Sequence, residues 1–329
     1  MDLSISRVIG DGLNAALGPA AAYYALAAIG LNVHFGFTGL LNFGQVGFML
    51  VGAYGFAISV SMWGLPFAVG ILVGLSWAVL LALLLGLPTL RLRADYLAIA
   101  TIAAAEILRF VFRSSPATPL TGGPYGIPNH LGGPGWTQTL NAMNPIPPGM
   151  YRLGPLSFTG PRLWQMIIGW TVVALCVWLV WALMRSPWGR VIKSIREDEE
   201  AVRSLGKNVF AYKMQSLVLG GVIGGLGGVL MALTFGSVTT AAFLPQVTFF
   251  AYTILILGGA ATVFGPVIGS AIFWFLLQSI ESLLRQTQIM DSTSIGPLRI
   301  ALVGSMLMAL MIYRPQGLFG NKREMMLNA

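Results

Sequence analysis

The chain has 329 residues, of which 56% are hydrophobic and 9% are charged. A soluble domain carries about 25% charged residues, so this chain lacks the charge needed to cover a water-facing surface. Its net charge of +8 does not indicate nucleic-acid binding, because basic residues gather in one interval between apolar runs. That distribution is the positive-inside pattern of a membrane protein.

Apolar runs of about 20 residues recur along the chain, and a helix of that length crosses about 30 Å of hydrocarbon. The period-two alternation of barrel strands is absent from the sequence. We therefore predict an all-α fold, a polytopic transmembrane helical bundle with about nine hydrophobic segments and a range of about eight to ten. In chain order the segments cover residues 13–33, 40–60, 66–87, 96–112, 163–184, 214–235, 249–257, 267–280 and 300–312.

The N-terminus has neither the basic start nor the cleavage site of a signal peptide, so we expect the first segment to act as the insertion signal. Cys176 is the only cysteine and lies in an apolar run. A disulfide within the chain and a cysteine-based metal site are therefore excluded. We expect no metal and no cofactor in this chain.

Residues 113–162 are rich in glycine and proline and carry little charge between their ends. This composition predicts a structured loop with a short turn near Trp136. Residues 185–213 are strongly basic and are expected in the cytoplasm, together with Arg91 and Arg93, which makes 113–162 an external loop. The basic residues of this cytoplasmic interval are Arg185, Arg190, Lys193, Arg196, Arg203, Lys207 and Lys213.

The C-terminal tail with Lys322 and Arg323 follows four segments later and is also expected in the cytoplasm. The side of the N-terminus depends on residues 40–60. If they cross fully, the N-terminus is outside; if they re-enter, it is inside.

The stretch from Gly36 to Gly47 places two amide side chains in an apolar run. Uncompensated amides are unfavourable in hydrocarbon, and Asn42 and Gln45 would share one face of a helix. Glycines such as Gly44 and Gly47 let a helix unwind or two helices approach closely. One interpretation is a broken helix that lines a solute path. The alternative is a tightly packed helix pair joined by amide hydrogen bonds.

Glu106 and Arg109 lie three residues apart within an apolar segment, so they can pair on one helix face. The pair is either a gate or contact for a zwitterionic solute, or an internal ion pair that fixes helix packing. Further along, the overlapping small-residue spacings of residues 220–228 predict a close-packing face between helices.

Apolar residues recur at helical spacing through the basic interval, with charged residues between them, which predicts a short amphipathic helix over 192–205 outside the membrane core. It is either a solvated segment held at the lipid headgroups or a docking helix for a soluble partner. The acidic residues in its middle favour a protein partner. The apolar positions are Val191, Ile192, Ile195, Val202 and Leu205.

Residues 189–206, Gly-Arg-Val-Ile-Lys-Ser-Ile-Arg-Glu-Asp-Glu-Glu-Ala-Val-Arg-Ser-Leu-Gly, resemble the cytoplasmic loop of branched-chain amino-acid ABC-transporter permeases of the LivM-like branch. Glu200-Ala201 followed by Gly206 is similar to the EAA-x3-G signature of ABC importer permeases, with Val202 at the third position. Further stretches resemble the same family in the same order: residues 39–47, 96–109 with 121–127, and 257–269.

This resemblance implies a single transmembrane permease domain over residues 1–329 in the inner or plasma membrane of a prokaryotic-type cell. The implied partners are a second related permease, two cytoplasmic ATPases and an external solute-binding protein. Ile195 or Leu205 would sit in an ATPase groove. The implied ATPase-coupling residues are Ile195, Arg196, Glu197, Glu200, Ala201, Leu205 and Gly206. The expected translocation path contains Asn42, Gly44, Gln45, Gly47, Glu106 and Arg109.

The chain is not expected to be an enzyme, because the P-loop pattern is absent: Gly206-Lys207 is followed by Asn208. ATP would bind on separate subunits. A stand-alone secondary transporter or channel is the alternative, with Glu106 and His34 as its only candidate proton carriers. A membrane-embedded enzyme would need clustered catalytic side chains, which the sequence lacks. The solute, a branched-chain or other amino acid or a small polar molecule such as urea, stays open, as does homodimer or heterodimer assembly.

Overall fold

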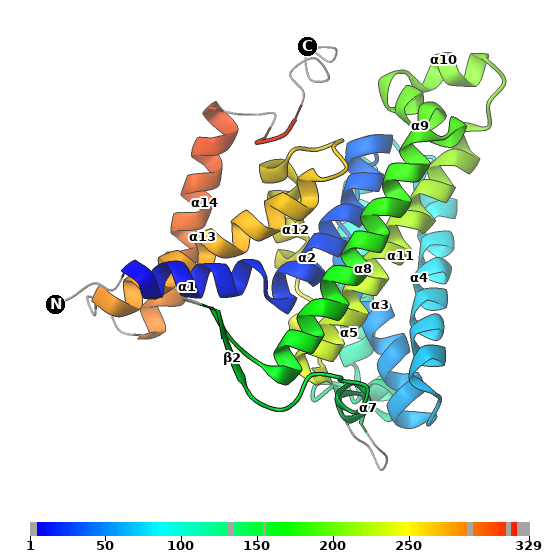
Figure 1. Cartoon of the computed structure of the whole chain (residues 1–329). Coiled ribbons are helices and arrows are strands. Elements are labelled where there is room, and N and C mark those ends of the chain that lie inside the picture. The colour runs from blue at the N-terminus through cyan, green and yellow to red at the C-terminus, as the bar shows by residue number, and fades with distance from the viewer. Residues whose placement is uncertain (1–4, 130–134, 154–155, 288–291, 314–316, 321–329) are drawn as a thin grey trace.

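The computed structural model describes residues 5–129, 135–153, 156–287, 292–313 and 317–320, most of which form a bundle of helices (Figure 1). The α-helices are α1 (Ile5–Ala16), α2 (Pro19–Leu31), α3 (Gln45–Ala57), α4 (Phe67–Thr89), α5 (Ala94–Arg113), α6 (Thr118–Thr121), α7 (Trp136–Ala142), α8 (Gly160–Arg185), α9 (Pro187–Glu197), α10 (Glu199–Ser204), α11 (Val209–Phe235), α12 (Pro245–Gly258), α13 (Gly265–Thr287) and α14 (Ser292–Tyr313).

Short segments complete the architecture. Two π-helical segments, η1 (Asn32–Phe37) and η2 (Ile58–Met62), extend α2 and α3. Two 3-10 turns are η3 (Ser115–Ala117) and η4 (Thr240–Ala242). Strand β1 (Ile127–Pro128) pairs with β4 (Ser237–Val238), and β2 (Met150–Leu153) pairs with β3 (Leu156–Thr159), both antiparallel.

Each of the predicted hydrophobic segments coincides with a helix, which confirms the predicted all-α bundle. Within the described residues, 7 helical stretches are long and apolar enough to cross a membrane. The two segments outside that set correspond to α5 and α14. Helix α5 carries charged residues along its length, including Glu106 and Arg109, and its sequence is therefore less hydrophobic than those of the other long helices.

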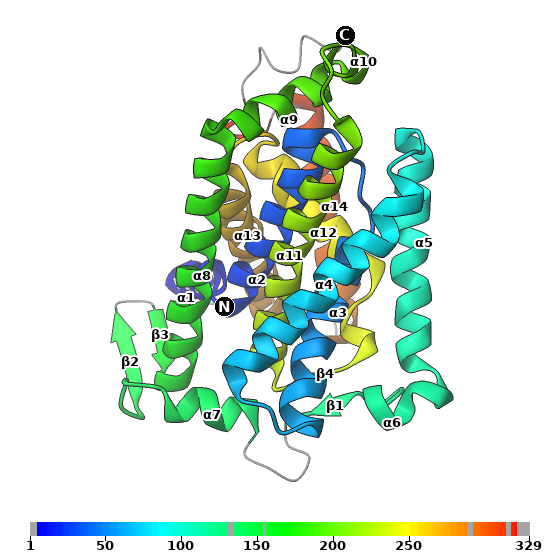
Figure 2. The same ribbon diagram turned by 90° about the vertical axis from the view of Figure 1, so that its right-hand side faces the viewer.

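Helix α11 lies at the centre of the bundle and packs against α2, α3 and α4 (Figure 2). The glycines of residues 220–228 permit this approach. A β-carbon at Gly220 would overlap the carbonyl oxygen of Gly30 on α2, and one at Gly228 would overlap that of Met49 on α3. The close-packing face predicted for these glycines is therefore confirmed.

The predicted start of the first segment, residues 13–33, is wrong, because the helix breaks at Gly18-Pro19. Proline at the first position of α2 has no backbone N–H, and the first turn of a helix does not need that donor, so Gly18-Pro19 favours the start of a new helix. The preceding residues form α1, a separate helix that packs against α13 (Figure 1). The first span consists of α2 with η1, Pro19–Phe37.

The described residues of the Gly/Pro-rich interval 113–162 form regular elements, as predicted. It contains η3, α6, β1, α7, β2 and β3, at the end of the bundle opposite α9 and α10 (Figure 2). Trp136 is buried at the start of α7, where its Nε1 donates a 3.3 Å hydrogen bond to the carbonyl oxygen of Ala232 on α11. That this interval is external stays a prediction.

Residues 40–60 cross the bundle. At one end, Gly39 lies against Arg196 of α9. At the other, Ser61 donates a 3.4 Å hydrogen bond to the carbonyl oxygen of Asn129, near α7. Only the second part is helical, because residues 39–44 are irregular and α3 begins at Gln45. The chain therefore enters α2 from the end of the bundle where residues 113–162 lie. The tail residues Lys322 and Arg323, which we expect in the cytoplasm, lie outside the described residues.

Candidate functional site

The loop between α8 and α11 contains two helices, which corrects the prediction of one helix over 192–205. Asp198 is extended, with φ −152° and ψ 102°, and separates α9 from α10. Its carboxylate accepts hydrogen bonds from the backbone N–H groups of Glu200 and Ala201, both 2.9 Å long. A short polar side chain that caps a new helix in this way ends the preceding helix. The spacing of apolar residues cannot predict such a break.

The apolar face of α9 and α10 is turned toward the rest of the chain. Ile195, Val202 and Val209 form a small buried cluster, in which Ile195 is only 4% exposed. Ile195 is therefore not accessible to a partner's groove in the conformation described, and its role in ATPase coupling stays a prediction. Leu205, the other expected anchor, is 79% exposed at the end of α10. The expected coupling residues Glu197, Glu200, Ala201 and Gly206 are also exposed, and Arg196 is half-buried.

Glu199 fixes the position of α10 relative to α11. Its carboxylate pairs with Arg203 on the same helix, 2.8 Å away, and with Lys213 on α11. An exposed ion pair contributes only about 0.2–1 kcal/mol, but the bond to Lys213 also defines the angle between two helices. The loop is thus held as a unit on the end of α11.

Arg196 joins this unit to the first span. Its Nη1 donates a 2.6 Å hydrogen bond to the carbonyl oxygen of Gly36 in η1. Beside it, the Lys193 ammonium lies over the Phe37 ring, 5.9 Å from the centroid. Gly39 has a positive φ of +77° and packs on the Arg196 side chain, so only glycine fits there without strain.

Asn32 joins the same π-helical segment to the link between α12 and α13. Its Nδ2 donates to the carbonyl oxygen of Thr262 at 2.7 Å, and its Oδ1 accepts from the N–H of Ala261 at 2.9 Å. Ala261 has a φ of +61°, which is strained for a residue with a side chain. Sequence reasoning missed Asn32, although a polar residue inside an apolar run is itself an indication.

His34, Asn42 and Gln45 form a buried hydrogen-bonded network between the first span, α3 and α11. Asn42 Nδ2 donates to His34 Nδ1 at 3.0 Å and to Gln45 Oε1 at 3.3 Å. Gln45 Nε2 donates to the carbonyl oxygens of Ala27 at 3.4 Å and Gly220 at 3.2 Å. Asn42 and Gln45 meet although Asn42 precedes α3, so they do not share a helix face as the spacing suggested.

The partners of this network define the tautomer of His34. Its Nε2 lies 3.1 Å from the carbonyl oxygen of Leu217, which can only accept, so Nε2 carries the proton. Asn42 Oδ1 accepts from the Gly44 N–H at 2.9 Å, which directs the Asn42 amino group to His34 Nδ1. Nδ1 is then an acceptor, and the imidazole is neutral.

Gly44 and Gly47 bring α3 against α5. A β-carbon at Gly44 would overlap the carbonyl oxygen of Thr101, and Gly47 packs on Ala105. The expected path amides Asn42 and Gln45 are buried, with exposures of 1% and 0%. This geometry matches the packing interpretation in the conformation described, and the assignment of these residues to a solute path stays a prediction.

Glu106 and Arg109 form the expected ion pair on α5, with Nη2 and Oε2 2.7 Å apart. Their side chains are 26% and 12% exposed, respectively. Their neighbours Ile107 and Phe110 are exposed, because α5 lies at the edge of the bundle (Figure 2). The structure brings this pair together next to Ala105, which packs on Gly47 of α3, and its role in transport or packing stays a prediction.

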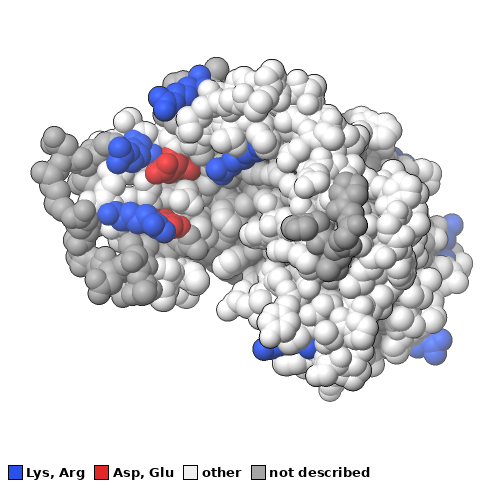
Figure 3. Space-filling model, turned by 90° about the horizontal axis from the view of Figure 1, so that it is seen from below, with Lys and Arg blue, Asp and Glu red and all other residues white. Residues whose placement is uncertain are grey.

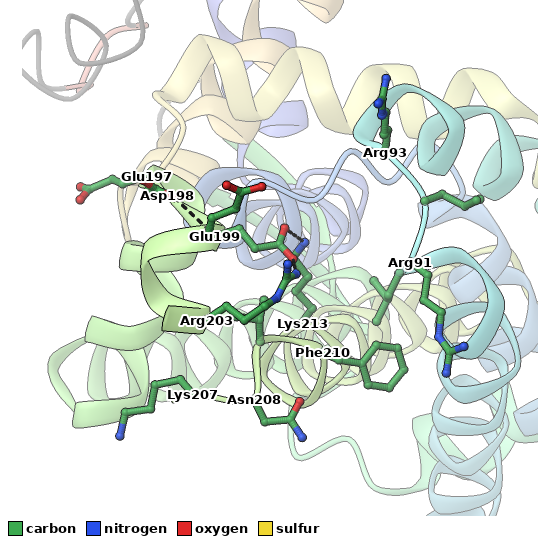
Figure 4. A pocket seen from close by; sticks show the side chains of 14 residues that line it. Arg91, Arg93, Glu197, Asp198, Glu199, Arg203, Lys207, Asn208, Phe210 and Lys213 are labelled. Atoms are coloured by element: carbon green, nitrogen blue, oxygen red, sulfur yellow. Dashed lines mark hydrogen bonds and ion pairs between the residues drawn. The ribbon is translucent and has the colours of Figure 1, made fainter. Parts of the chain in front are cut away.

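A groove of about 1050 Å³ lies between the α9–α10 unit and the link from α4 to α5 (Figure 4). Arg91 and Arg93 stand on the link side, and the Arg91 guanidinium lies over the Phe210 ring, 5.8 Å from its centroid. The groove confirms that these arginines share one end of the bundle with the basic interval, as the charge pattern predicted. The lining residues are 90–93, 197–200, Arg203, 207–210 and Lys213.

The opposite end of the molecule is largely uncharged. Viewed from that side, most of the surface is neither acidic nor basic, and the charged side chains lie toward its margins (Figure 3). The larger group of basic residues, the basic interval with Arg91 and Arg93, therefore lies at the other end of the bundle, as the positive-inside pattern predicts.

Comparison with known proteins places the chain in a family. Residues 18–313 match the family described as branched-chain amino acid transport system / permease component. The high-affinity branched-chain amino acid transport system permease protein LivM of Escherichia coli is 30% identical over 308 residues, which cover 90% of this chain and 67% of that protein. The probable LivM of Methanocaldococcus jannaschii is 24% identical, over 91% of both chains.

A relative with a different named solute is also found. The nucleoside ABC transporter permease protein NupC of Lactococcus lactis is 29% identical over 206 residues, 59% of each chain. Together with the transmembrane helices, these matches identify a multi-pass ABC transporter permease. The chain belongs to the family of branched-chain amino acid transport system permease components.

Proposed function

We propose that this chain is the membrane-spanning subunit of an ATP-driven importer for a branched-chain amino acid, another amino acid or a similar small polar solute such as urea. It would work by alternating access in the inner or plasma membrane of a prokaryotic-type cell. The partners would be a second related permease, two cytoplasmic ATPase subunits and an external solute-binding protein. The names of the LivM relatives support the amino-acid class, and the absence of a P-loop pattern from the sequence is consistent with ATP binding on separate subunits.

The observation that carries this proposal is the bond from Arg196 to the Gly36 carbonyl oxygen. Because α9 is packed as one unit with α10 and α11, a force applied at the exposed Leu205 is passed to Arg196 and on to η1. Segments of π-helix are rare and are often found at functional sites. In η1, Asn32, His34 and Gly36 each bond to another element.

The solute path is proposed along Asn42, Gly44, Gln45 and Gly47, with Glu106 and Arg109 nearby on α5. In the conformation described, the amides bond to each other and to helix carbonyls. Parting of α3 from α11 would expose the same donors and acceptors to a polar solute. The opposite charges of Glu106 and Arg109 match the ammonium and carboxylate of a zwitterion.

The test is a cysteine crosslink at the exposed end of the loop. Glu200→Cys and Leu205→Cys would each be introduced with Cys176→Ser and treated with a bifunctional reagent in native membranes. We expect a crosslink to a P-loop ATPase whose yield changes with added ATP. Arg152→Cys on β2, at the opposite end of the bundle, is the control and should give none. A loop that labels freely without a crosslinked partner would favour a stand-alone transporter.

A further inference from the structure

The groove beside the α9–α10 unit has a basic wall, the link with Arg91 and Arg93, and a mixed wall that carries acidic side chains as well as Lys207. Glu199 is neutralised by Arg203 and Lys213, and the Asp198 carboxylate is engaged by the α10 backbone. In the described part of the chain, the arginines of the link, Arg91 and Arg93, have no acidic partner within ion-pair distance. Neither Glu197 nor Glu200 on the facing wall has a basic one.

We infer that the ATPase subunit is held between two walls, the α9–α10 unit and the α4–α5 link of residues 90–93. This inference rests on the proposed function and adds a second contact to it. The occupant would present an acidic group to Arg91 and Arg93 and a basic group to Glu197 and Glu200.

Charge complementarity favours this occupant over a lipid headgroup. An anionic headgroup satisfies the arginines but is repelled by the facing carboxylates, Glu197 and Glu200, which are exposed. A protein surface can carry both signs at the required separation, and oppositely charged patches also steer association. The groove volume of about 1050 Å³ admits a folded segment of several side chains.

The second wall has a mechanical consequence. Arg93 immediately precedes α5, whose next turns carry the Glu106–Arg109 pair. Because α5 lies at the edge of the bundle and packs closely on α3 at Gly44 and Gly47, a pull at its first residue would be passed on to α3 (Figure 2). One motor subunit would then move α5 and, through Arg196, η1 together.

The experiment compares the two walls with the same reagent. Leu92→Cys on the link and Glu200→Cys on the loop, each with Cys176→Ser in the full chain, are crosslinked in native membranes. We expect both to join the same P-loop ATPase, identified by mass spectrometry. Reversal of the link charge, Arg91→Glu with Arg93→Glu, should lower the ATPase retained on the purified permease about tenfold. Arg113→Glu, exposed at the other end of α5, should leave it unchanged.

The outcomes separate this inference from the function on which it rests. If position 200 crosslinks and position 92 does not, the second wall is wrong and the proposed function stands. If neither crosslinks, both fall. If the reversal spares ATPase retention but weakens binding to phosphatidylglycerol vesicles, the link contacts lipid headgroups and the inference is wrong. The double variant Arg91→Ala with Arg93→Ala removes the positive charges without adding negative ones, so it tests the link if the reversal variant fails to fold. It should also lower the amount of ATPase retained on the permease.

Discussion

Arg196 on α9 donates a 2.6 Å hydrogen bond to the carbonyl oxygen of Gly36, a residue 160 positions earlier in the chain. Gly36 also lies where the first span meets the α12–α13 link, since a β-carbon there would overlap Asn32 Oδ1 and crowd the N–H of Ala261. Three elements that are distant in sequence therefore meet at one glycine. A displacement of α9 reaches η1 directly and the α12–α13 link through Asn32.

Arg196→Ala should uncouple transport from ATP hydrolysis. A hydrogen bond to a charged group contributes about 1.5–3 kcal/mol, which corresponds to roughly tenfold or more in a transport step that depends on it. We expect reconstituted importer to hydrolyse ATP while uptake falls about tenfold. Arg190→Ala, on the same helix but exposed, is the control. Equal uptake by both variants would show that the bond carries no movement.

Asn32→Ala should destabilise the bundle, because the Ala261 N–H and the Thr262 carbonyl oxygen both lose their side-chain partner. A fully buried polar group left unpaired costs about 1–3 kcal/mol, and these two are partly buried, so the loss should lie toward the lower end of that range. The measurement is the thermal unfolding temperature of the purified chain in detergent. Asn141→Ala, on the exposed surface of α7, should unfold at the wild-type temperature. An unchanged temperature for Asn32→Ala would mean that the strained link is held by other contacts.

Ile195 and Leu205 should respond in opposite ways. Ile195→Ala opens a cavity in the cluster under α9, and truncation of a buried isoleucine costs about 2–5 kcal/mol, so the unfolding temperature should fall. Leu205→Asp changes an exposed side chain and should leave unfolding and membrane insertion intact while uptake is lost. Glu200→Lys should resemble Leu205→Asp. Normal uptake by both of these surface variants would contradict the coupling role of α10.

Asn42→Ala and Gln45→Ala should lower uptake without preventing assembly. Hydrogen bonds between helices in membranes average about 0.6 kcal/mol and reach about 1.7 kcal/mol, so one lost donor is tolerated by the fold. Assembly is measured by size-exclusion chromatography of the complex and transport by solute uptake. Loss of assembly would support a packing role for these amides and remove them from the path.

Glu106→Gln leaves Arg109 without its counter-ion on α5. The cost should lie between the about 0.2–1 kcal/mol of an exposed pair and the about 3–5 kcal/mol of a buried one, since the pair is partly exposed. The exchanged pair, Glu106→Arg with Arg109→Glu, should recover the unfolding temperature. If the pair contacts a zwitterionic solute, uptake should stay low in the exchanged variant although its stability recovers. If uptake recovers together with stability, the pair has a purely structural role.

The location of the spans was predictable from sequence because hydrocarbon imposes a local requirement. Each span must satisfy its own backbone hydrogen bonds and bury few charges, so hydropathy alone locates the helix. It was also predictable that Arg91, Arg93 and the basic interval lie at the same end of the bundle, because the number of spans between them returns the chain to that side. The Glu106–Arg109 pair was also predictable, since both residues lie within one turn of one helix.

The errors arose where short-range chemistry outweighs the apolar pattern. Gly18-Pro19 starts a new helix inside a continuous apolar run, and Asp198 caps α10 inside a continuous amphipathic pattern. Both indications are present in the sequence, as a proline at a first turn and an aspartate before two glutamates. Prediction from hydrophobic spacing alone therefore joined α1 with α2 and α9 with α10, which are separate helices in the structure.

What the sequence by itself determined is the membrane class, the spans, the asymmetry of charge and, through ordered motifs, the permease family. Only the tertiary structure decided which polar groups meet. Asn32 bonds to a carbonyl 230 residues away, Gln45 to one 175 residues away and Arg196 to one 160 residues away. Their partners are backbone atoms, which every residue carries, so no side-chain pattern marks them. Burial forces such groups to find a partner, but packing chooses which one.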